Sequence, residues 1–168
     1  LMSPDVSLNS SYFHSSFLVE DGSTDLVWFM MSVDENTSQP IMGPVVSSSV
    51  SGSVPSYASY NLVPFYYTPG DWYHIEFRNI SFSSNTYDYY VNNQLIHASV
   101  PFRQSPYNVD RVRISHYTPE TVVSYFDNID FSTNGTTIWG EDFETGLPNW
   151  SYGSSYSNNV VNANIISN

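Results

Sequence analysis

The sequence predicts an all-β protein built from antiparallel sheets, and two patterns carry that prediction. The first is a series of short runs rich in aromatic and β-branched residues, each bounded by turn residues, through residues 72–131. The second is that apolar residues between these runs do not recur with the period of a helix. Four strands within sixty residues leave room only for tight connections, so we expect antiparallel neighbours.

Composition agrees with a single β-sandwich whose surface is polar but sparsely charged. Aromatic residues make up 17% of the 168 residues and charged residues only 12%, which is not the composition of a disordered chain. A chain of this length buries about two thirds of its unfolded surface as one domain. Cysteine is absent, so we expect the core alone to hold the fold together.

The charge balance excludes several classes of partner. The net charge is −12, from four arginines, no lysine and 16 acids. No basic stripe is present to replace phosphate counterions, so we expect no nucleic-acid partner, and the same argument excludes an anionic membrane surface. No apolar run approaches the roughly twenty residues of a membrane span. The polar surface indicates an extracellular protein, and the start at Leu1, with no signal peptide, indicates a processed product.

The first expected element is an N-terminal amphipathic strand. Four apolar residues alternate there with polar ones: Met2, Pro4, Val6 and Leu8. Two interpretations stay open, an edge strand of its own domain or a strand donated to a groove in a second copy. We therefore divide the chain into residues 1–10, the candidate donor strand, and residues 11–168, the sandwich domain.

Four segments follow before the central strands. Residues 11–19 predict a strand, and the continuous apolar run at residues 26–33 predicts a strand buried on both faces. Residues 34–44 predict a loop because Pro and Gly interrupt them. Residues 45–67 predict two strands with irregular edges, since Pro55 and Pro64 break their alternation.

The central and C-terminal strands come with clear turn signals. The expected strands are residues 72–77, 87–91, 94–96, 109–115, 125–131, 138–143 and 161–165. Asn92-Asn93 suits the positive φ angles of a type I′ turn, and Asn134-Gly135 is a second hairpin turn.

Two segments resemble known jelly-roll families. Residues 72–131, which include W-Y-H-I-E-F, Y-D-Y-Y-V-N-N-Q, V-D-R-V-R-I-S and Y-F-D-N-I-D-F, look like the concanavalin A-like or laminin-G-like jelly roll, and also like jelly-roll modules that bind carbohydrate. Residues 142–150 resemble the D-F-E-x-G-x-P-x-W opening of such modules, here near the C-terminus. The chain would then be permuted, cut from a longer repeat, or finished by a strand from elsewhere. The resemblance implies an antiparallel jelly-roll β-sandwich, and it speaks for fold far more than for function.

Catalytic residues are hard to find, and we predict that the protein is not an enzyme. The sequence lacks the E-x-D-x-x-E strand of laminarinase-type jelly-roll enzymes, a G-x-S-x-G motif and a thiol nucleophile. Glycosidases need two facing carboxylates, but Glu141 and Asp142 point to opposite faces of a strand. The histidines share no metal-binding spacing: His14, His74, His97 and His116.

The jelly-roll resemblance implies one metal, a structural calcium. The matching positions are Asp142 and Glu144 with Asp127, and Asp130 is a further candidate. Calcium takes about six to eight oxygen ligands, which carboxylates and carbonyls supply. The alternative is that these acids are simply solvated at strand ends. We expect no other cofactor.

A carbohydrate site would need exposed aromatic rings as stacking platforms. The best candidates in loop-like contexts are Tyr57, Tyr60, Tyr107 and Tyr117. A sandwich of this size also needs many aromatic residues in its core, so each of these tyrosines has a structural interpretation as well.

Sequons for N-linked glycans occur at five positions: Asn9, Asn36, Asn79, Asn134 and Asn149. Roughly four would arise by chance in so Asn-, Ser- and Thr-rich a chain under the sequon rule, so their number proves nothing. Their placement at predicted turns and strand ends suits glycans that must stay outside the fold.

The leading functional hypothesis is a secreted, glycosylated cell-surface protein that polymerises into a filament by inserting its N-terminal strand into the next copy. In composition and layout the chain is similar to archaeal thread or pilus-like filament subunits. The expected partners are other copies of the chain and N-linked glycans. The alternative is a carbohydrate-binding module or lectin-like adhesin with structural calcium, and a glycoside hydrolase or lyase is a third hypothesis.

Overall fold

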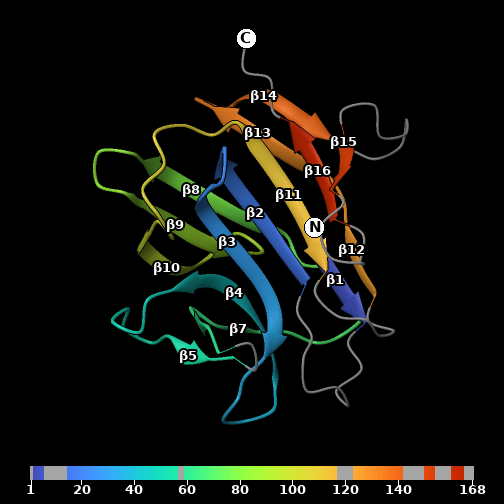
Figure 1. Cartoon of the computed structure of the whole chain (residues 1–168). Coiled ribbons are helices and arrows are strands. Elements are labelled where there is room, and N and C mark those ends of the chain that lie inside the picture. The colour runs from blue at the N-terminus through green and yellow to red at the C-terminus, as the bar shows by residue number, and fades with distance from the viewer. Residues whose placement is uncertain are drawn as a thin grey trace.

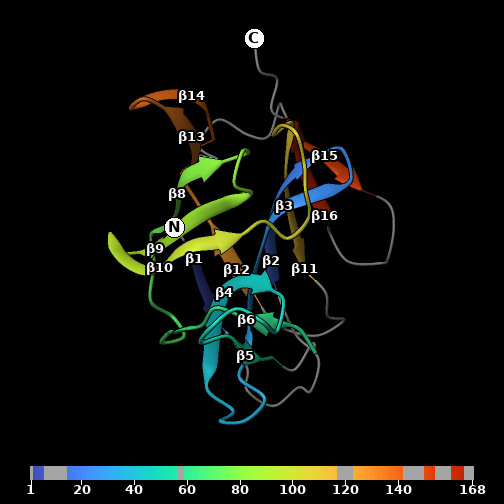
Figure 2. The ribbon, with the colours of Figure 1, turned by 90° about the vertical axis from the view of Figure 1, so that its left-hand side faces the viewer.

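A computed structural model describes residues 2–5, 15–56, 59–116, 123–141, 150–153 and 160–164. Within these ranges the chain forms strands and turns and no α-helix, and every strand pair is antiparallel. The all-β prediction is confirmed, and the layered sheets are consistent with a β-sandwich (Figures 1 and 2). The described part of the chain holds no helix long and apolar enough to cross a membrane.

The larger sheet forms one layer of the molecule. Its strands, in spatial order, are β15 (Trp150–Gly153), β16 (Val160–Asn164), β11 (Arg111–His116), β2 (Ser15–Asp21), β3 (Thr24–Val33), β4 (Pro40–Val46), β6 (Asn61–Leu62) and β5 (Val54–Pro55), and β7 (Phe65–Tyr66) also pairs with β4. The hairpin between β2 and β3 turns at Gly22, whose φ of 60° suits glycine.

The smaller sheet lies on the other side of the core (Figure 2). It consists of β10 (Gln94–Pro101), β9 (Thr86–Val91) and β8 (Ile75–Ser81) in that order. The β9–β10 hairpin turns at Asn92 and Asn93, with φ angles of 50° and 64°. Both angles lie in the left-handed region, as a type I′ turn requires, so the turn prediction is confirmed.

Two strand pairs complete the described fold. β1 (Met2–Asp5) pairs with β12 (Val123–Phe126), and β13 (Ile129–Thr133) pairs with β14 (Thr136–Glu141). The expected single strand at residues 125–131 is wrong in one respect: it breaks between β12 and β13. Asn128 has a φ of 50° there, which ends the extended backbone.

Aromatic rings from both sheets meet in the core. The Phe29 ring of β3 lies 5.9 Å from the Phe77 ring of β8 and 6.0 Å from the Tyr89 ring of β9, in edge-on contacts. Phe77 also contacts Tyr87 at 5.4 Å. Burial raises the pKa of both tyrosines. These contacts join the two layers without any disulfide, because the chain has no cysteine.

β4 is the main departure from the expected strands. The loop prediction for residues 34–44 is wrong, because β4 begins at Pro40 and buries Ile41 and Met42 completely. Its glycine serves close packing and not a turn. A Cβ on Gly43 would lie 1.9 Å from the carbonyl oxygen of Val63, so no larger residue fits.

The outer face of the larger sheet carries a second, smaller apolar cluster. It contains Met30, Ile41, Val45 and Leu62, with Trp28, Val54 and Tyr60 packed against it. β3 is therefore buried on both faces, as the sequence predicted. The described residues between 54 and 66 form three strands of two residues each, β5, β6 and β7, where two strands with irregular edges were expected over residues 45–67.

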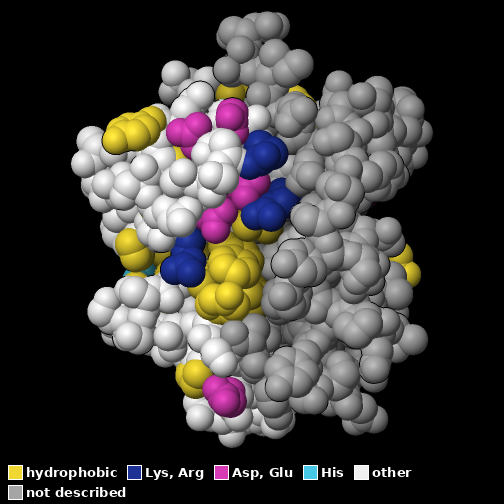
Figure 3. Space-filling model, in the orientation of Figure 1, with side chains coloured by type: hydrophobic (Ala, Val, Ile, Leu, Met, Phe, Trp, Pro, Cys, Tyr) yellow, Lys and Arg dark blue, Asp and Glu magenta, His cyan; other side chains and the backbone are white. Residues whose placement is uncertain are grey.

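A cluster of charges lies beside this apolar patch (Figure 3). Glu20 has 1% of its surface exposed and binds both Arg111 and Arg113. Asp25 lies beside Glu20, and its carboxyl is 3.9 Å from Arg113. A buried carboxylate needs such partners, because an unpaired charge would be expelled from the interior.

Asp25 makes the stability of the fold dependent on pH. Burial, and then the hydrogen bond and charge of Glu20, raise the pKa of Asp25 from 3.8 to about 6, and Arg113 and Arg103 oppose this shift. The pKa of Asp25 is higher in the folded chain than in the unfolded chain, so protonation of Asp25 stabilises the fold. This contribution to stability is complete below about pH 4 and is lost above about pH 6. We expect the free energy of unfolding to fall by about 1 to 2 kcal/mol between pH 4 and pH 7 from this group, because water screens its partly exposed carboxyl.

Urea denaturation of the native chain and of Asp25→Asn across that pH range measures the difference. Asp25→Asn should not show the fall in the free energy of unfolding between pH 4 and pH 7. Asp71→Asn, at an exposed position, should still show it. Parallel pH profiles for the native chain and Asp25→Asn would contradict the assignment.

Candidate functional site

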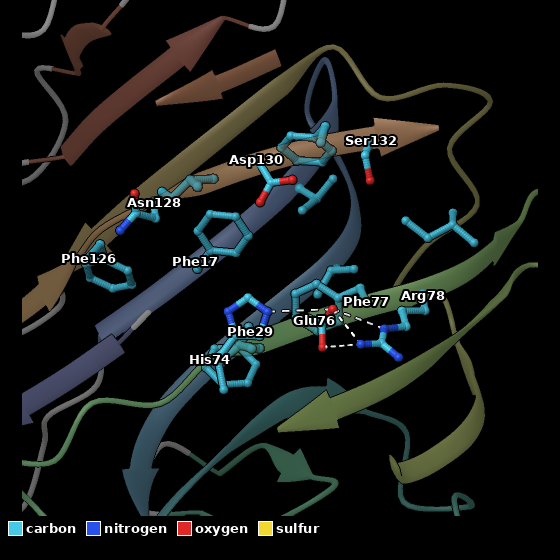
Figure 4. A pocket seen from close by; sticks show the side chains of 16 residues that line it. Phe17, Phe29, His74, Glu76, Phe77, Arg78, Phe126, Asn128, Asp130 and Ser132 are labelled. Carbon is cyan, nitrogen blue, oxygen red and sulfur yellow. Dashed lines mark hydrogen bonds and ion pairs between the residues drawn. The ribbon is translucent and has the colours of Figure 1, made fainter. Parts of the chain in front are cut away.

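A groove of about 370 Å³ opens beside the smaller sheet (Figure 4). One wall is β8 with the residue before it, and the other wall runs through β12 and β13. We call it the β8–β13 groove. Four apolar residues of β2 and β3 form its floor: Phe17, Val19, Val27 and Phe29.

The floor follows from the register of the β2–β3 hairpin. Phe17 is opposite Phe29 and Val19 is opposite Val27, so the inward positions of both strands coincide. Alternate residues of a strand point to one face, which places these four side chains together on the inner face of the larger sheet. The groove therefore lies over the hydrophobic core, and these four core residues stay buried beneath it.

The first wall is a strand edge without a partner in the described ranges. β8 pairs with β9 alone. The amide of Asn92 donates to the carbonyl oxygen of His74 at 2.8 Å, so the peptide groups of His74 and of every second residue after it face β9. Ile75 and Phe77 consequently present their N–H and C=O groups to the groove.

The second wall is also a free edge. Among the described strands β13 pairs only with β14. Figures 1 and 2 both place β13 between β14 and β8, so its other edge faces the groove. The side chains of Ile129 and Phe131 pack against the core below it.

The two walls run in the same direction. Residue numbers rise from His74 to Arg78 along one wall and from Phe126 to Ser132 along the other, in the same sense (Figure 4). In an antiparallel sheet, two strands that run the same way are separated by one strand of opposite direction. The groove thus has the polarity of one missing antiparallel strand.

Polar side chains line both rims. On β8, Arg78 binds Glu76 through both carboxylate oxygens, at 2.8 and 2.6 Å, and His74 Nε2 lies 3.6 Å from Glu76 Oε1. The hydrogen bond to Glu76 raises the pKa of Arg78. Asn128 and Asp130 lie on the opposite rim (Figure 4). A strand in the groove would meet apolar floor on one face and polar rims on the other.

The N-terminal strand reaches one end of this groove. β1 runs antiparallel to β12 with Met2 opposite Phe126, and Phe126 lines the groove. From there β1 runs away from the groove, to Asp5 opposite Val123. The other two predicted donor positions, Val6 and Leu8, lie outside the described residues.

The predicted calcium ligands are only partly described. Asp142 and Glu144 lie outside the described residues. The carboxylate of Asp127 accepts a hydrogen bond from the amide of Asn128 at 2.9 Å, and Asp130 lines the groove. No three His, Asp or Glu side chains within the described ranges form a group that could hold a metal ion.

The two described tyrosines among the predicted ligand-binding residues lie in different surroundings. Tyr60 packs on Trp28, with ring centroids 4.6 Å apart, as part of the outer apolar cluster. Tyr107 is 95% exposed. Tyr57 and Tyr117 lie outside the described residues.

Sequence analysis missed another aromatic pair. Trp72 and Tyr125, each about half exposed, lie with ring centroids 6.3 Å apart at the Phe126 end of the groove. These two residues are about fifty positions apart in the sequence, so no local pattern indicates that they meet. The only signal in the sequence was a tryptophan after a Pro-Gly turn.

Three of the five sequons are described, and all three asparagines are exposed. Asn36 lies in the turn after β3 and Asn134 in the β13–β14 turn. Asn79 lies in β8, where its side-chain amide donates to Asp88 at 2.7 Å. Asn9 and Asn149 lie outside the described residues.

The described groups considered for catalysis lie on different elements of the fold. His74 lies on the groove rim, whereas His97 binds the carbonyl oxygen of Ala98. His116 ends β11, and Glu141 is buried at the end of β14. His14 lies outside the described residues.

Comparisons of this chain with protein-family models, curated proteins and solved structures found no match. The geometry of the groove is therefore the basis for any functional proposal.

Hydrogen exchange tests the free edge of β8. We expect the amides of Ile75 and Phe77 to exchange at least about tenfold faster than those of Glu76 and Arg78, because only the latter pair donates to β9. Amide-resolved exchange by NMR on the dilute chain measures this. Equal protection at all four positions would show that β8 already has a partner on its outer edge.

Proposed function

We propose that the protein is a structural subunit that assembles with further copies of itself by β-strand addition. An extended strand of one copy enters the β8–β13 groove of the next. The observation that carries this proposal is the groove itself, in which two strand edges that have no partner among the described strands run the same way over an apolar floor. One antiparallel strand satisfies both edges and covers the floor together.

The energetics favour a long-lived joint. Each apolar side chain that the added strand buries contributes about 1.5 to 3 kcal/mol, and the backbone of Ile75 and Phe77 gains hydrogen-bond partners. Withdrawal of the strand would return the edges of both walls to water. An unpaired edge of this kind recruits strands, so natural proteins cover it.

The proposed setting is extracellular, as a glycosylated filament at the cell surface without enzymatic activity. The exposed positions of Asn36, Asn79 and Asn134 support glycan attachment there. The polar, lysine-free composition supports the same setting. In this proposal the sandwich has a jelly-roll topology that a donated strand completes.

A proline at the free edge should block assembly. Ile75→Pro removes an N–H that faces the groove and places a ring on the edge, where proline is tolerated in a strand. We expect filaments in negative-stain micrographs of the native chain and of Ile75→Val, and none from Ile75→Pro. A folded state of the proline variant is verified by circular dichroism.

A deletion of residues 1–9 is the second variant, since it leaves β8 intact. It should also abolish filaments. A native chain that stays monomeric at all concentrations, or filaments that both changes leave intact, would overturn the proposal.

Carbohydrate binding is a second candidate function, and the aromatic pair Trp72 and Tyr125 supports it. The two half-exposed rings are inclined at 50°, and each lies one or two positions before a residue that lines the groove, Phe126 after Tyr125 and His74 after Trp72. Apolar ring faces beside hydrogen-bonding groups are what a sugar ring needs.

We expect Trp72→Ala to weaken glycan retention at least about tenfold, which corresponds to about 1.4 kcal/mol. Phe82→Ala is the matched control, because Phe82 is an exposed aromatic residue outside this pair and outside the groove lining. Affinity electrophoresis in polysaccharide gels measures retention. A native chain that no glycan retards would eliminate this candidate.

A further inference from the structure

We infer that the strand that fills the β8–β13 groove is the N-terminal segment, residues 1–9, of a second copy, and that it runs antiparallel to both walls. This inference rests on the proposed assembly by strand addition, and it adds the identity and the direction of the donor.

The acceptor's own N-terminal strand does not fill the groove. Its register places Met2 opposite Phe126, and each following residue pairs one position further from the groove, as far as Asp5 opposite Val123. Ile129 and Phe131 therefore lie beyond the reach of β1 in this register. The open stretch needs a strand from another chain.

The groove continues a pairing that the chain already makes. β1 is antiparallel to β12, and β13 follows β12 after a break of two residues. Phe126 belongs to both features, since it pairs with Met2 and lines the groove. The N-terminal sequence of a second copy, placed against β13, would repeat this established pairing one strand further along the same line.

The direction follows from the two walls. Because β8 and β13 run the same way, only an antiparallel strand between them continues the antiparallel order of the smaller sheet. The donor then has its first residues near Ser132 and its last residues near Phe126. This is also the direction of β1 relative to β12.

Among the described amphipathic strands, β1 has fewer pairings to give up than β16. Donation requires β1 to leave its own β12, with which it pairs on one edge over four residues, whereas β16 pairs on both edges, with β11 and β15. The alternation of residues 2–9 places apolar side chains toward the floor and polar ones toward the rims.

Charge complementarity restricts how this segment lies in the groove. Its one ionisable side chain is Asp5. Glu76 and Asp130 lie on opposite rims near the middle of the groove, with Arg78 toward one end (Figure 4). Like charges directly opposite are destabilising in a sheet. We therefore place Asp5 away from the level of Glu76 and Asp130 along the groove. The small, uncharged residues beside Asp5 in the segment then lie between these two acids.

Distances between spin labels test the donor and its direction. The chain has no cysteine, so Tyr125→Cys in the full-length acceptor gives one label, at the half-exposed position beside Phe126. The donor is an excess of a synthetic peptide of residues 1–9 with a nitroxide at either its first or its last residue. Double electron–electron resonance measures the distance to each end.

We expect the C-terminal label of the peptide to lie nearer to position 125 than the N-terminal label, by roughly 20 Å at about 3.4 Å per residue. A peptide with Val6→Asp is the matched control, and it should not bind, because its charge would face the apolar floor.

The outcomes separate the two proposals. The reverse order of distances would overturn the antiparallel direction while binding still supports strand addition. No binding of the peptide to a chain that nevertheless forms filaments would overturn the N-terminal segment as donor. A chain that neither binds the peptide nor forms filaments would overturn the assembly function itself.

Discussion

The constraint on which the rest of this structure depends is the need of every backbone N–H and C=O group for a hydrogen-bond partner. Most strands of the described fold meet it with a neighbour in the sheet. At the β8–β13 groove, the hydrogen-bonded pairing of the described strands stops at two strand edges, one on each side of an apolar floor. Water can solvate these edges, but a strand with one apolar face satisfies them and also packs over the core side of the groove, so the groove favours an occupant of that kind.

The aromatic core explains why the groove stays open within one chain. Phe77 of β8 is held against Phe29 and Tyr87, so β8 cannot move across to pair with β13 without giving up these contacts. On the other wall, Ile129 and Phe131 pack against the same core. Both edges are therefore fixed in place, which lowers the entropic cost of receiving a strand.

Much of the fold could be predicted because it rests on local chemistry. Asn92-Asn93 and Asn134-Gly135 adopt the positive φ angles that their side chains tolerate, and the unbroken apolar run of β3 is buried on both faces. β4 escaped prediction because Gly43 resembles a turn residue, and its role is visible only once Val63 lies against it. The break at Asn128 escaped because Asn also fits an extended strand end.

By itself the sequence determined the class of fold, its hairpins and the amphipathic character of the N-terminal segment, since each depends on residues a few positions apart. Only the tertiary structure decided where the candidate site lies. Its walls, His74 to Arg78 and Phe126 to Ser132, come from strands fifty residues apart, and their shared direction depends on how the sheets are layered. The pairing of Trp72 with Tyr125 has the same origin. Such juxtapositions carry no local signal, because side-chain alternation specifies which face is buried and not which strand lies beside it.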